Sequence, residues 1–297
     1  MKLVASHPRS RPVPATIERH FTAVSAASLR EIVERISIPR PLGSPENAAV
    51  RRAIVELFQQ TACAELGIVV DEGGNVVVGE PRRARILVGA HYDSLATTPG
   101  ADDNASAVAA LITVARAVGA RPGACFVAFD GEELGFLGSG AFVERLGRHR
   151  PEEVHILEML GYASREPGSQ RNPIPILQAP TVGDFIGLVG SHASGFLLDR
   201  VLAVAACHGV PVQALYLPNV PLEALARVSY HLLRSDHVPF WRMGMPALMW
   251  TDTAEFRNPN YHQPTDTPET LDYPFLAEVT RLLTHVVLAG LNREGQP

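Results

Sequence analysis

Acidic and histidine side chains gather in one part of the sequence, between Ile86 and Ser139. This stretch contains His91, Asp93, Asp102, Asp103, Glu132 and Glu133. Each lies just beyond an apolar segment typical of a buried strand, or at the predicted start of a helix. Zinc in hydrolases takes imidazole nitrogen and carboxylate oxygen and keeps one coordination position open for water. The spacing therefore predicts a metal site, with further ligands and the substrate pocket supplied by the rest of the chain.

His91 ends an apolar strand and is the first candidate ligand. A histidine at such a place is more often structural when taken alone. Asp93, two residues later, is suitably placed to accept the other ring N–H, as carboxylates beside metal-bound histidines commonly do. We therefore expect His91 to bind metal and Asp93 to assist catalysis by supporting it.

Asp102 and Asp103 lie directly before an alanine-rich helical segment. Asp and Asn are favoured as helix N-caps, which is an alternative role for Asp103 or Asn104. Two adjacent acids after Pro99-Gly100 exceed what one cap needs. We therefore assign Asp102 to the metal and a supporting role to Asp103.

Glu132 and Glu133 follow the apolar strand ACFVAFD and are flanked by Gly131 and Gly135. A solvated surface pair is the ordinary interpretation of two adjacent acids. Here the pair follows a buried strand rather than a polar helix face, so one acid can bind metal while its neighbour takes a proton from water. We expect Glu133 to bind metal and Glu132 to be the general base.

The elements that position these residues alternate between strand and helix. Strands are predicted over 84–90, 124–130 and 154–160, and helices over 104–119 and 136–147. This alternation favours a largely parallel sheet with helices on both faces. Functional groups collect beyond the carboxyl ends of such strands, which places His91, Glu132 and Glu158 at one edge.

The flanking segments complete the prediction. Residues 1–25 are expected to be an extended or poorly ordered arm, and 26–297 one α/β domain. Further helices are predicted over 26–37, from Ser44-Pro45 to Gly67, and over 196–209 and 273–291. A hairpin is predicted over 67–80 and strands over 211–218 and 245–250, whereas 160–193 should form loops that shape a pocket.

Composition limits the classes of function. The 297 residues are 46% hydrophobic and 19% charged, with a net charge of -5, which gives no electrostatic footprint for nucleic acid. No uninterrupted apolar run reaches the roughly 18 residues of a membrane span. Three cysteines without CxxC spacing indicate neither a disulfide framework nor a thiolate zinc site. The first residues contain no apolar leader segment, so a cytoplasmic location is expected.

Six motifs, in order, carry a resemblance to a known family: GAHYDS, PGADDNAS, FDGEELGFLGS, LEMLGY, RSDHVPF and YHQPTDT. Over roughly residues 40 to 290 the chain resembles the co-catalytic zinc aminopeptidases, a family that also includes glutaminyl cyclases. The resemblance implies a single three-layer α/β domain with a mixed, mostly parallel central sheet and helices on both faces.

The resemblance also implies roles for individual residues and two Zn²⁺ ions per chain. It gives His91, Asp102 and Glu158 to one ion, Asp102, Glu133 and His262 to the other, and the general base to Glu132. Many family members have Asp where this chain has Glu158. Asp236 in RSDHVPF is expected to support the site, and Asp266 in the last motif to be a turn residue.

The function expected from these residues is hydrolysis of the N-terminal peptide bond of a peptide or aminoacyl substrate. The alternatives are glutaminyl cyclisation, which in this family typically uses one zinc, and a non-catalytic binding domain. The cyclases lack the histidine of the first motif, so His91 favours the aminopeptidase. Nothing in the sequence indicates an oligomeric state.

Overall fold

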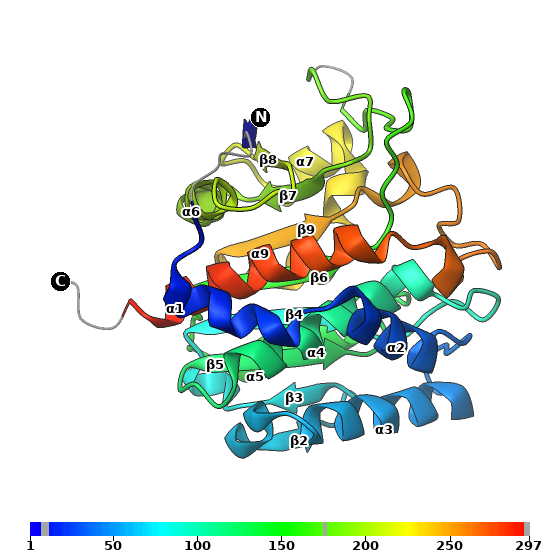
Figure 1. The fold of residues 1–297 in the computed structure, drawn as a ribbon, viewed down its shortest axis with the longest axis vertical. Helices are drawn as coiled ribbons and strands as arrows, with labels where there is room; N and C mark the ends of the chain where they lie inside the picture. Colours follow the sequence, from blue (N-terminus) through cyan, green and yellow to red (C-terminus); the bar gives the residue numbers. More distant parts are fainter. Residues whose placement is uncertain (7–11, 175–176, 294–297) are drawn as a thin grey trace.

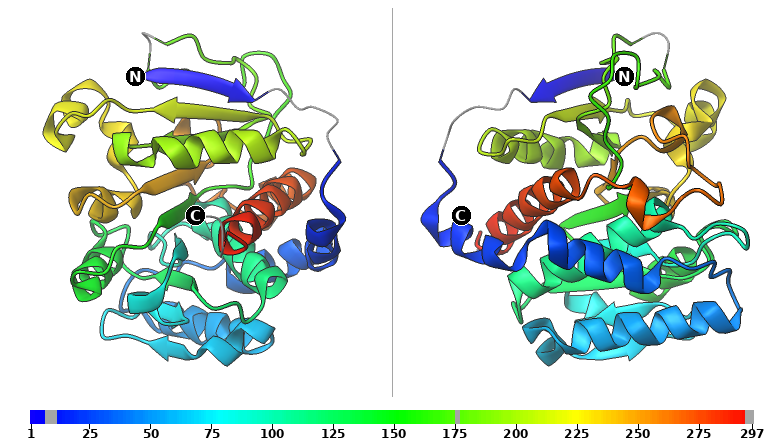
Figure 2. Two further views of the ribbon diagram at one scale, coloured as in Figure 1. Left: turned by 90° about the vertical axis from the view of Figure 1, so that its left-hand side faces the viewer. Right: turned by 45° about the vertical axis from the view of Figure 1, so that its right-hand side comes forward.

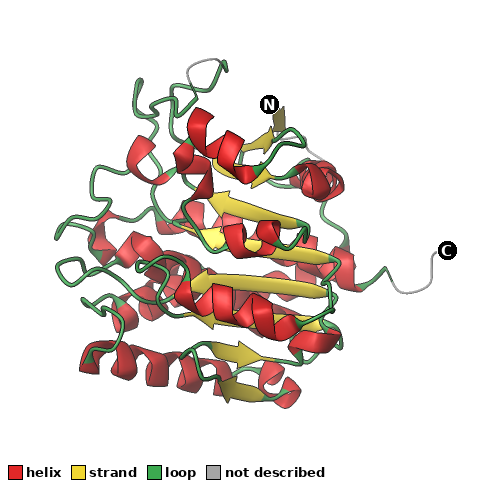
Figure 3. Cartoon of the chain, turned by 180° about the vertical axis from the view of Figure 1, so that it is seen from behind, coloured by secondary structure: helices red, strands yellow, loops and turns green. Residues whose placement is uncertain are grey.

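A nine-stranded sheet organises the part of the chain that the computed structural model describes, residues 1–6, 12–174 and 177–293. Its order is β1-β8-β7-β9-β6-β4-β5-β3-β2, from one edge to the other (Figures 1 and 3). The bounds are β1 Lys2–Ser6, β2 Ile68–Val70, β3 Val76–Val78, β4 Ile86–His91, β5 Ala124–Phe129, β6 Glu153–Glu158, β7 Ile186–Gly190, β8 Val212–Tyr216 and β9 Ala247–Thr251.

The centre of the sheet is parallel and its margins are mixed. β5, β4, β6 and β9 run parallel, β7 is antiparallel to β9, and β8 is parallel to β7. β1 and the β2–β3 hairpin add antiparallel pairings at the two edges. The predicted mixed sheet, with the functional strands parallel at its centre, is confirmed.

Helices cover both faces, which confirms the predicted three layers. One face carries α2 Ala26–Ile36, α3 Pro45–Gln59, α4 Ala107–Val118, α6 Gly195–Ala205 and α9 Tyr273–Leu291. The other carries α5 Leu137–Leu146, α7 Leu222–Val228 and α8 His237–Arg242. Figure 2 shows these layers from two sides. The short α1, Ala15–Glu18, precedes α2.

The interior helices are apolar because they are buried nearly all round. In α4, Arg116 is the one residue that is not buried. α9 is long and apolar enough to cross a bilayer by length and composition alone, but 78% of it is buried within the structure. It packs against α2, α4 and α6, as a core helix does (Figure 1).

The structure differs from the sequence predictions at several elements. Residues 2–6 form the edge strand β1 and 15–23 form helical turns, where an extended or poorly ordered arm was expected; residues 7–11 lie outside the described part. The helix starting at Pro45 ends at Gln59, before a short 3-10 turn, instead of at Gly67. β7 lies within the segment expected to be loops, and its two glycines weaken a strand pattern.

Candidate metal centre

The ends of the parallel strands bring the predicted chemistry together. His91 is the last residue of β4 and Glu158 the last of β6, and the two strands are hydrogen-bonded neighbours. Glu132 and Glu133 follow β5, which pairs with the other side of β4. Because these strands run parallel, their carboxyl ends meet at one edge of the sheet, as expected.

Two groups of donor atoms form there, each with its atoms within 4.8 Å of one another. The first consists of His91, Glu132 and Glu158, and the second of Asp103, Glu133 and His262. His91 Nε2 lies 3.5 Å from Glu158 Oε2. His262 Nε2 lies 3.4 Å from Glu133 Oε2. Nitrogen and oxygen donors at such separations can hold a divalent transition metal.

Asp103 joins the two groups. Its Oδ1 lies 3.3 Å from His91 Nε2, and its Oδ2 lies 3.1 Å from His262 Nε2. One carboxylate therefore faces both histidines, which is the position of a bridging ligand. The expectation that Asp102 takes this position, with Asp103 only in support, is wrong on the geometry.

Asp102 faces away from the histidines and is fully buried. It accepts hydrogen bonds from the backbone N–H of Gly161 (2.8 Å), from Ser106 Oγ (3.0 Å) and from Asn258 Nδ2 (2.7 Å). The backbone is not helical at Asp103, where φ is -101° and ψ is 85°, so the two neighbouring side chains diverge. Asp102 thus ties this turn to the segment after β6 and to Asn258.

Asp266 holds the backbone of the same turn. Its Oδ1 accepts the N–H of Asp102 (2.9 Å) and its Oδ2 the N–H of Asp103 (3.1 Å), and the residue is fully buried. It is therefore more than the expected turn residue. Asn104 adds a further tie, donating to Leu157 O and accepting from Met159 N on either side of Glu158.

Asp93 holds the backbone of Glu132 and Glu133, as Asp266 holds that of Asp102 and Asp103. Its carboxylate accepts the backbone N–H groups of Glu132 (3.1 Å) and Glu133 (3.2 Å). Its Oδ1 also lies 3.4 Å from His91 Nδ1. Asp93 therefore lies against the ring of His91, where the sequence predicted a supporting residue, and holds the backbone of both glutamates, but it is a member of neither donor group.

Asp236 and its neighbours lie beside the first donor group. Asp236 is fully buried and accepts a 2.5 Å hydrogen bond from Ser139 Oγ, which suits a supporting role. Ser235 Oγ donates to Glu158 Oε2 at 2.7 Å and so orients that carboxylate. His237 Nε2 lies 2.9 Å from Leu232 O, as expected for a structural histidine.

Arg40 is a buried cation that the sequence analysis missed, because it lies in the proline-rich loop before α3. It is fully buried and donates to the backbone carbonyls of Tyr92, Pro99 and Gly100, with no exposed surface. Burial lowers its pKa to about 10, and the carboxylates of Asp93 and Asp103 oppose this shift. It thus shapes the loop between His91 and Asp103 and partly offsets the acidic cluster.

The carboxylates of Glu132, Glu133 and Glu158 are buried close to one another, and this raises their pKa values. Burial raises the pKa of Glu133 to about 8, and repulsion from Asp103 adds to the shift. Burial also raises the pKa of Glu132 and of Glu158. Burial alone would lower the pKa of His91, but the facing carboxylates of Glu158 and Glu132 raise it well above 6.5. Divalent cations would relieve this crowding, so the donor atoms suit metal binding.

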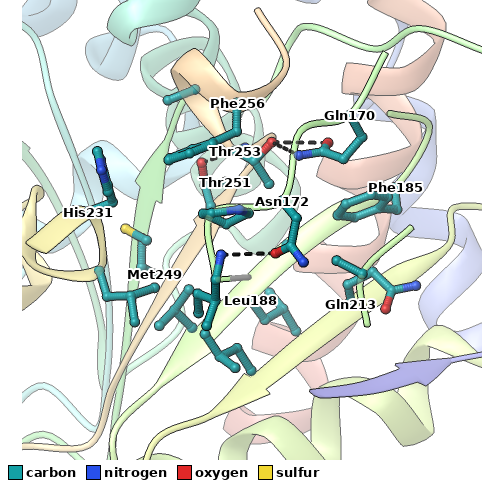
Figure 4. A pocket seen from close by; sticks show the side chains of 18 of the residues that line it. Gln170, Asn172, Phe185, Leu188, Gln213, His231, Met249, Thr251, Thr253 and Phe256 are labelled. Atoms are coloured by element: carbon teal, nitrogen blue, oxygen red, sulfur yellow. Dashed lines mark hydrogen bonds between the residues drawn. The ribbon is translucent and has the colours of Figure 1, made fainter. Parts of the chain in front are cut away.

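A pocket of about 960 Å³, including its open mouth, begins beside Glu158. Its lining is mostly apolar, with a polar rim made of His231, Arg234, Glu255 and Tyr261. Figure 4 shows His231 of this rim. Arg234 Nη1 donates to Glu255 Oε1 at 2.6 Å, and Arg234 also bonds the Tyr261 hydroxyl. Tyr261 in turn stacks on His262, with ring centroids 3.8 Å apart, so the rim of the pocket supports the second donor group.

A family model and curated relatives match this chain. The model of the family described as Peptidase family M28 matches residues 75–175 and 188–287. The chain is 37% identical over 213 residues to the uncharacterized protein YfbL of Escherichia coli, covering 65% of this chain and 63% of that protein. It is 26% identical over 257 residues to aminopeptidase YwaD of Bacillus subtilis, covering 80% of this chain and 50% of that one. The chain thus spans about half to two thirds of the length of these curated relatives.

Solved structures show the same fold. LapB from Legionella pneumophila superposes with a TM-score of 0.72 at 20% identity, covering 95% of this chain and 78% of that chain. A glutaminyl cyclase from Porphyromonas gingivalis superposes with a TM-score of 0.59 at 18% identity, covering 92% and 99%.

Proposed function

Because this chain belongs to peptidase family M28, we propose that it is a zinc-dependent aminopeptidase that hydrolyses the first peptide bond of a peptide or aminoacyl substrate. The observation that carries the proposal is the position of Asp103, whose two oxygens face His91 and His262 across two donor groups. The relative YwaD is named an aminopeptidase, and a structural neighbour from Bacillus subtilis is described as a zinc aminopeptidase.

The residues present fit two zinc ions. His91, Asp103 and Glu158 would hold one, and Asp103, Glu133 and His262 the other. Zinc at such sites polarises a carbonyl and lowers the pKa of water toward neutrality. Relative to the assignment expected from the sequence, Asp103 replaces Asp102 as the shared ligand.

Glu132 is the residue we assign to proton transfer. Its backbone is fixed by Asp93, and its carboxylate lies in the group with His91 and Glu158. Burial raises its pKa, which moves a carboxyl group toward the range in which it can both accept and return a proton near neutral pH. Glu132 would take a proton from the attacking water and deliver it to the departing amine.

The charge of the site suits a free substrate amine. The carboxylates that face the pocket mouth, Glu158 among them, attract an α-ammonium group, while the pocket beside Glu158 receives the first side chain. A substrate with a blocked amine would lose this interaction. The site therefore favours free N-termini.

Glutaminyl cyclisation is the competing function, because a structural neighbour is a glutaminyl cyclase. At 18% identity that likeness concerns the fold. The paired donor groups around Asp103 favour two metals, whereas the cyclase alternative expects one. Elemental analysis of the purified chain distinguishes them, since about two zinc ions per chain support the aminopeptidase and one supports the cyclase.

The activity test compares leucyl, N-acetyl-leucyl and N-terminal glutaminyl substrates on zinc-loaded protein. We expect hydrolysis of the free leucyl substrate only, and activity confined to blocked substrates would overturn the proposal. Glu132→Gln should keep its zinc content and lose kcat by about 10²–10⁴-fold. Glu31→Gln, at an exposed position of α2, is the matched control and should behave as wild type.

A further inference from the structure

The pocket does not end beside the metal centre but crosses the sheet. Its lining includes residues from five strands, among them Glu158 of β6, Met249 of β9, Val189 of β7, Leu215 of β8 and Leu3 of β1. These strands are consecutive neighbours in the sheet. The pocket is therefore a groove that runs across the strands toward the outer edge formed by β1. Figure 4 shows Met249, Thr251 and Gln213 of its lining.

The strand register sets two rows of side chains along the groove floor. Leu3 lies opposite Leu215, Leu215 opposite Val189, and Val189 opposite Met249, which makes a continuous apolar row. The second row runs through Gln213, Gly187, Thr251 and Glu158; it lies two residues before the first row in β8 and β7 and two residues after it in β9. Neighbouring strands lie about 4.8 Å apart, so the four steps from β6 to β1 span ~19 Å.

Gly187, in the middle of the second row, has no side chain to fill the groove. A Cβ added at Gly187 would lie 3.1 Å from Thr251 O, closer than ordinary van der Waals contact. Without a side chain there, the floor stays open between Thr251 and Gln213. Ile174 and Leu177 border the groove from the segment before β7. The walls beyond the polar rim are thus apolar over several strand widths.

β1 forms the end of this groove that is farthest from Glu158. Leu3 is partly buried against the same apolar cluster as Val189, Leu215 and Met249. Val4, by the alternation of a strand, points to the opposite face, where α6 lies against β1. β1 lies outside the residues that match the family model, which begin at residue 75.

We propose that the groove binds an extended apolar side group on the first residue of the substrate, longer than any coded side chain, and that Leu3 is the specificity residue that limits its length. The inference rests on the proposed function, since the reacting bond must lie at Glu158 for the side group to enter here. An apolar chain gains free energy with each methylene it buries, so the lining favours length up to the wall at Leu3.

The test uses p-nitroanilides of leucine, 2-aminooctanoic acid and 2-aminododecanoic acid on zinc-loaded protein. Wild type should show kcat/KM about tenfold higher for the 2-aminooctanoyl than for the leucyl substrate, mostly through KM. Leu3→Trp should lower kcat/KM about tenfold for the 2-aminododecanoyl substrate, whose side chain alone is long enough to approach β1, and leave the leucyl and 2-aminooctanoyl values unchanged. Leu3→Ala, a small change at a partly buried edge position, should leave kcat/KM for the 2-aminododecanoyl substrate equal to or above the wild-type value. Val4→Ala, on the other face of β1, should leave the profile unchanged.

A binding measurement separates this inference from the proposed function. Calorimetry of 2-aminododecanamide with Glu132→Gln protein should show binding that Leu3→Trp weakens about tenfold, without any turnover. If the protein hydrolyses the leucyl substrate but the Leu3 variants do not change the dependence of kcat/KM on side-chain length, the inference about the groove is overturned and the proposed function stands. Binding of the long amide that depends on Leu3, with no hydrolysis of any free aminoacyl substrate, overturns the proposed function alone.

Discussion

The carboxylate of Asp93 accepts the backbone N–H of Glu132 at 3.1 Å, and its second oxygen does the same for Glu133. The orientation of the proposed base and of the adjacent ligand therefore depends on one side chain that belongs to neither donor group. Glu132 and Glu133 belong to different groups, so Asp93 also sets how the two groups lie relative to each other.

Asp93→Asn should lower both metal affinity and turnover. The amide has one acceptor oxygen, so its NH₂ group would face the N–H of Glu132 or Glu133 and push that residue away. Loss of such orienting partners typically costs 10–100-fold in metal affinity or activity. Zinc titration against a chromogenic chelator, together with kcat, measures both. Asp272→Asn, at the N-cap of α9, is the control: Asn keeps one oxygen to accept the single N–H of Phe275, and zinc affinity should be unchanged.

Asp102 and Asp103 should differ sharply when each is changed to Asn. Asp103→Asn puts an NH₂ group toward one of the histidines, and we expect it to bind less than two zinc ions per chain and to lose turnover. Asp102→Asn should keep both ions, because Asp102 bonds Gly161, Ser106 and Asn258 instead. Zinc content by elemental analysis decides the matter, and loss of metal in the Asp102 variant alone would restore the sequence-based assignment.

Asp102 and Asp103 show which features of the site the sequence predicts and which it does not. The apolar strands before His91 and Glu158 fix which edge of the sheet carries the chemistry, and strand-to-helix alternation is enough to predict that. Choosing between adjacent acids needs the backbone angles at Asp103, which are not helical although a helix follows. Periodicity contains no information on such a turn.

Roles and elements that depend on tertiary contacts could not be predicted from the sequence either. Asp266 accepts the N–H groups of Asp102 and Asp103, which are more than 160 positions away in the sequence. Nothing in its local sequence distinguishes it from an ordinary turn aspartate. β1 was missed because five residues at an edge gain their strand conformation from pairing with β8. The cytoplasmic location expected from the sequence stays a prediction.

Arg40→Met should destabilise the fold and loosen the loop between His91 and Asp103. The substitution leaves the carbonyls of Tyr92, Pro99 and Gly100 without their donor, and buried unsatisfied acceptors cost about 1–3 kcal/mol each. Urea unfolding should show a loss of about 3 kcal/mol or more. Arg40→Lys should not restore it, since an ammonium cannot reproduce the guanidinium fork. Arg30→Met, at an exposed salt bridge with Glu34, should cost less than about 1 kcal/mol, and an equal loss in both variants would contradict the role of Arg40.

The histidine pair between α6 and α9 should make stability fall in mild acid. His208 Nε2 lies 3.1 Å from His285 Nδ1, and both residues are buried. Burial, together with the nearby His285 and Arg281, lowers the pKa of His208 to about 4. Since the folded pKa lies below the ordinary value of 6.5, the unfolded chain binds the proton first as pH falls. Folding stability therefore decreases between pH 6.5 and about 4.

For His208 this linkage amounts to about 2 kcal/mol of unfolding free energy between pH 7 and pH 5. His208→Gln should remove that part of the pH dependence, because glutamine does not titrate. Urea unfolding of wild type and variant at both pH values isolates the contribution of His208 from that of the acidic cluster, which is common to both proteins. His192→Gln, at an exposed position, is the control and should follow wild type. If His208→Gln loses as much unfolding free energy as wild type between pH 7 and pH 5, protonation of His208 does not account for the loss.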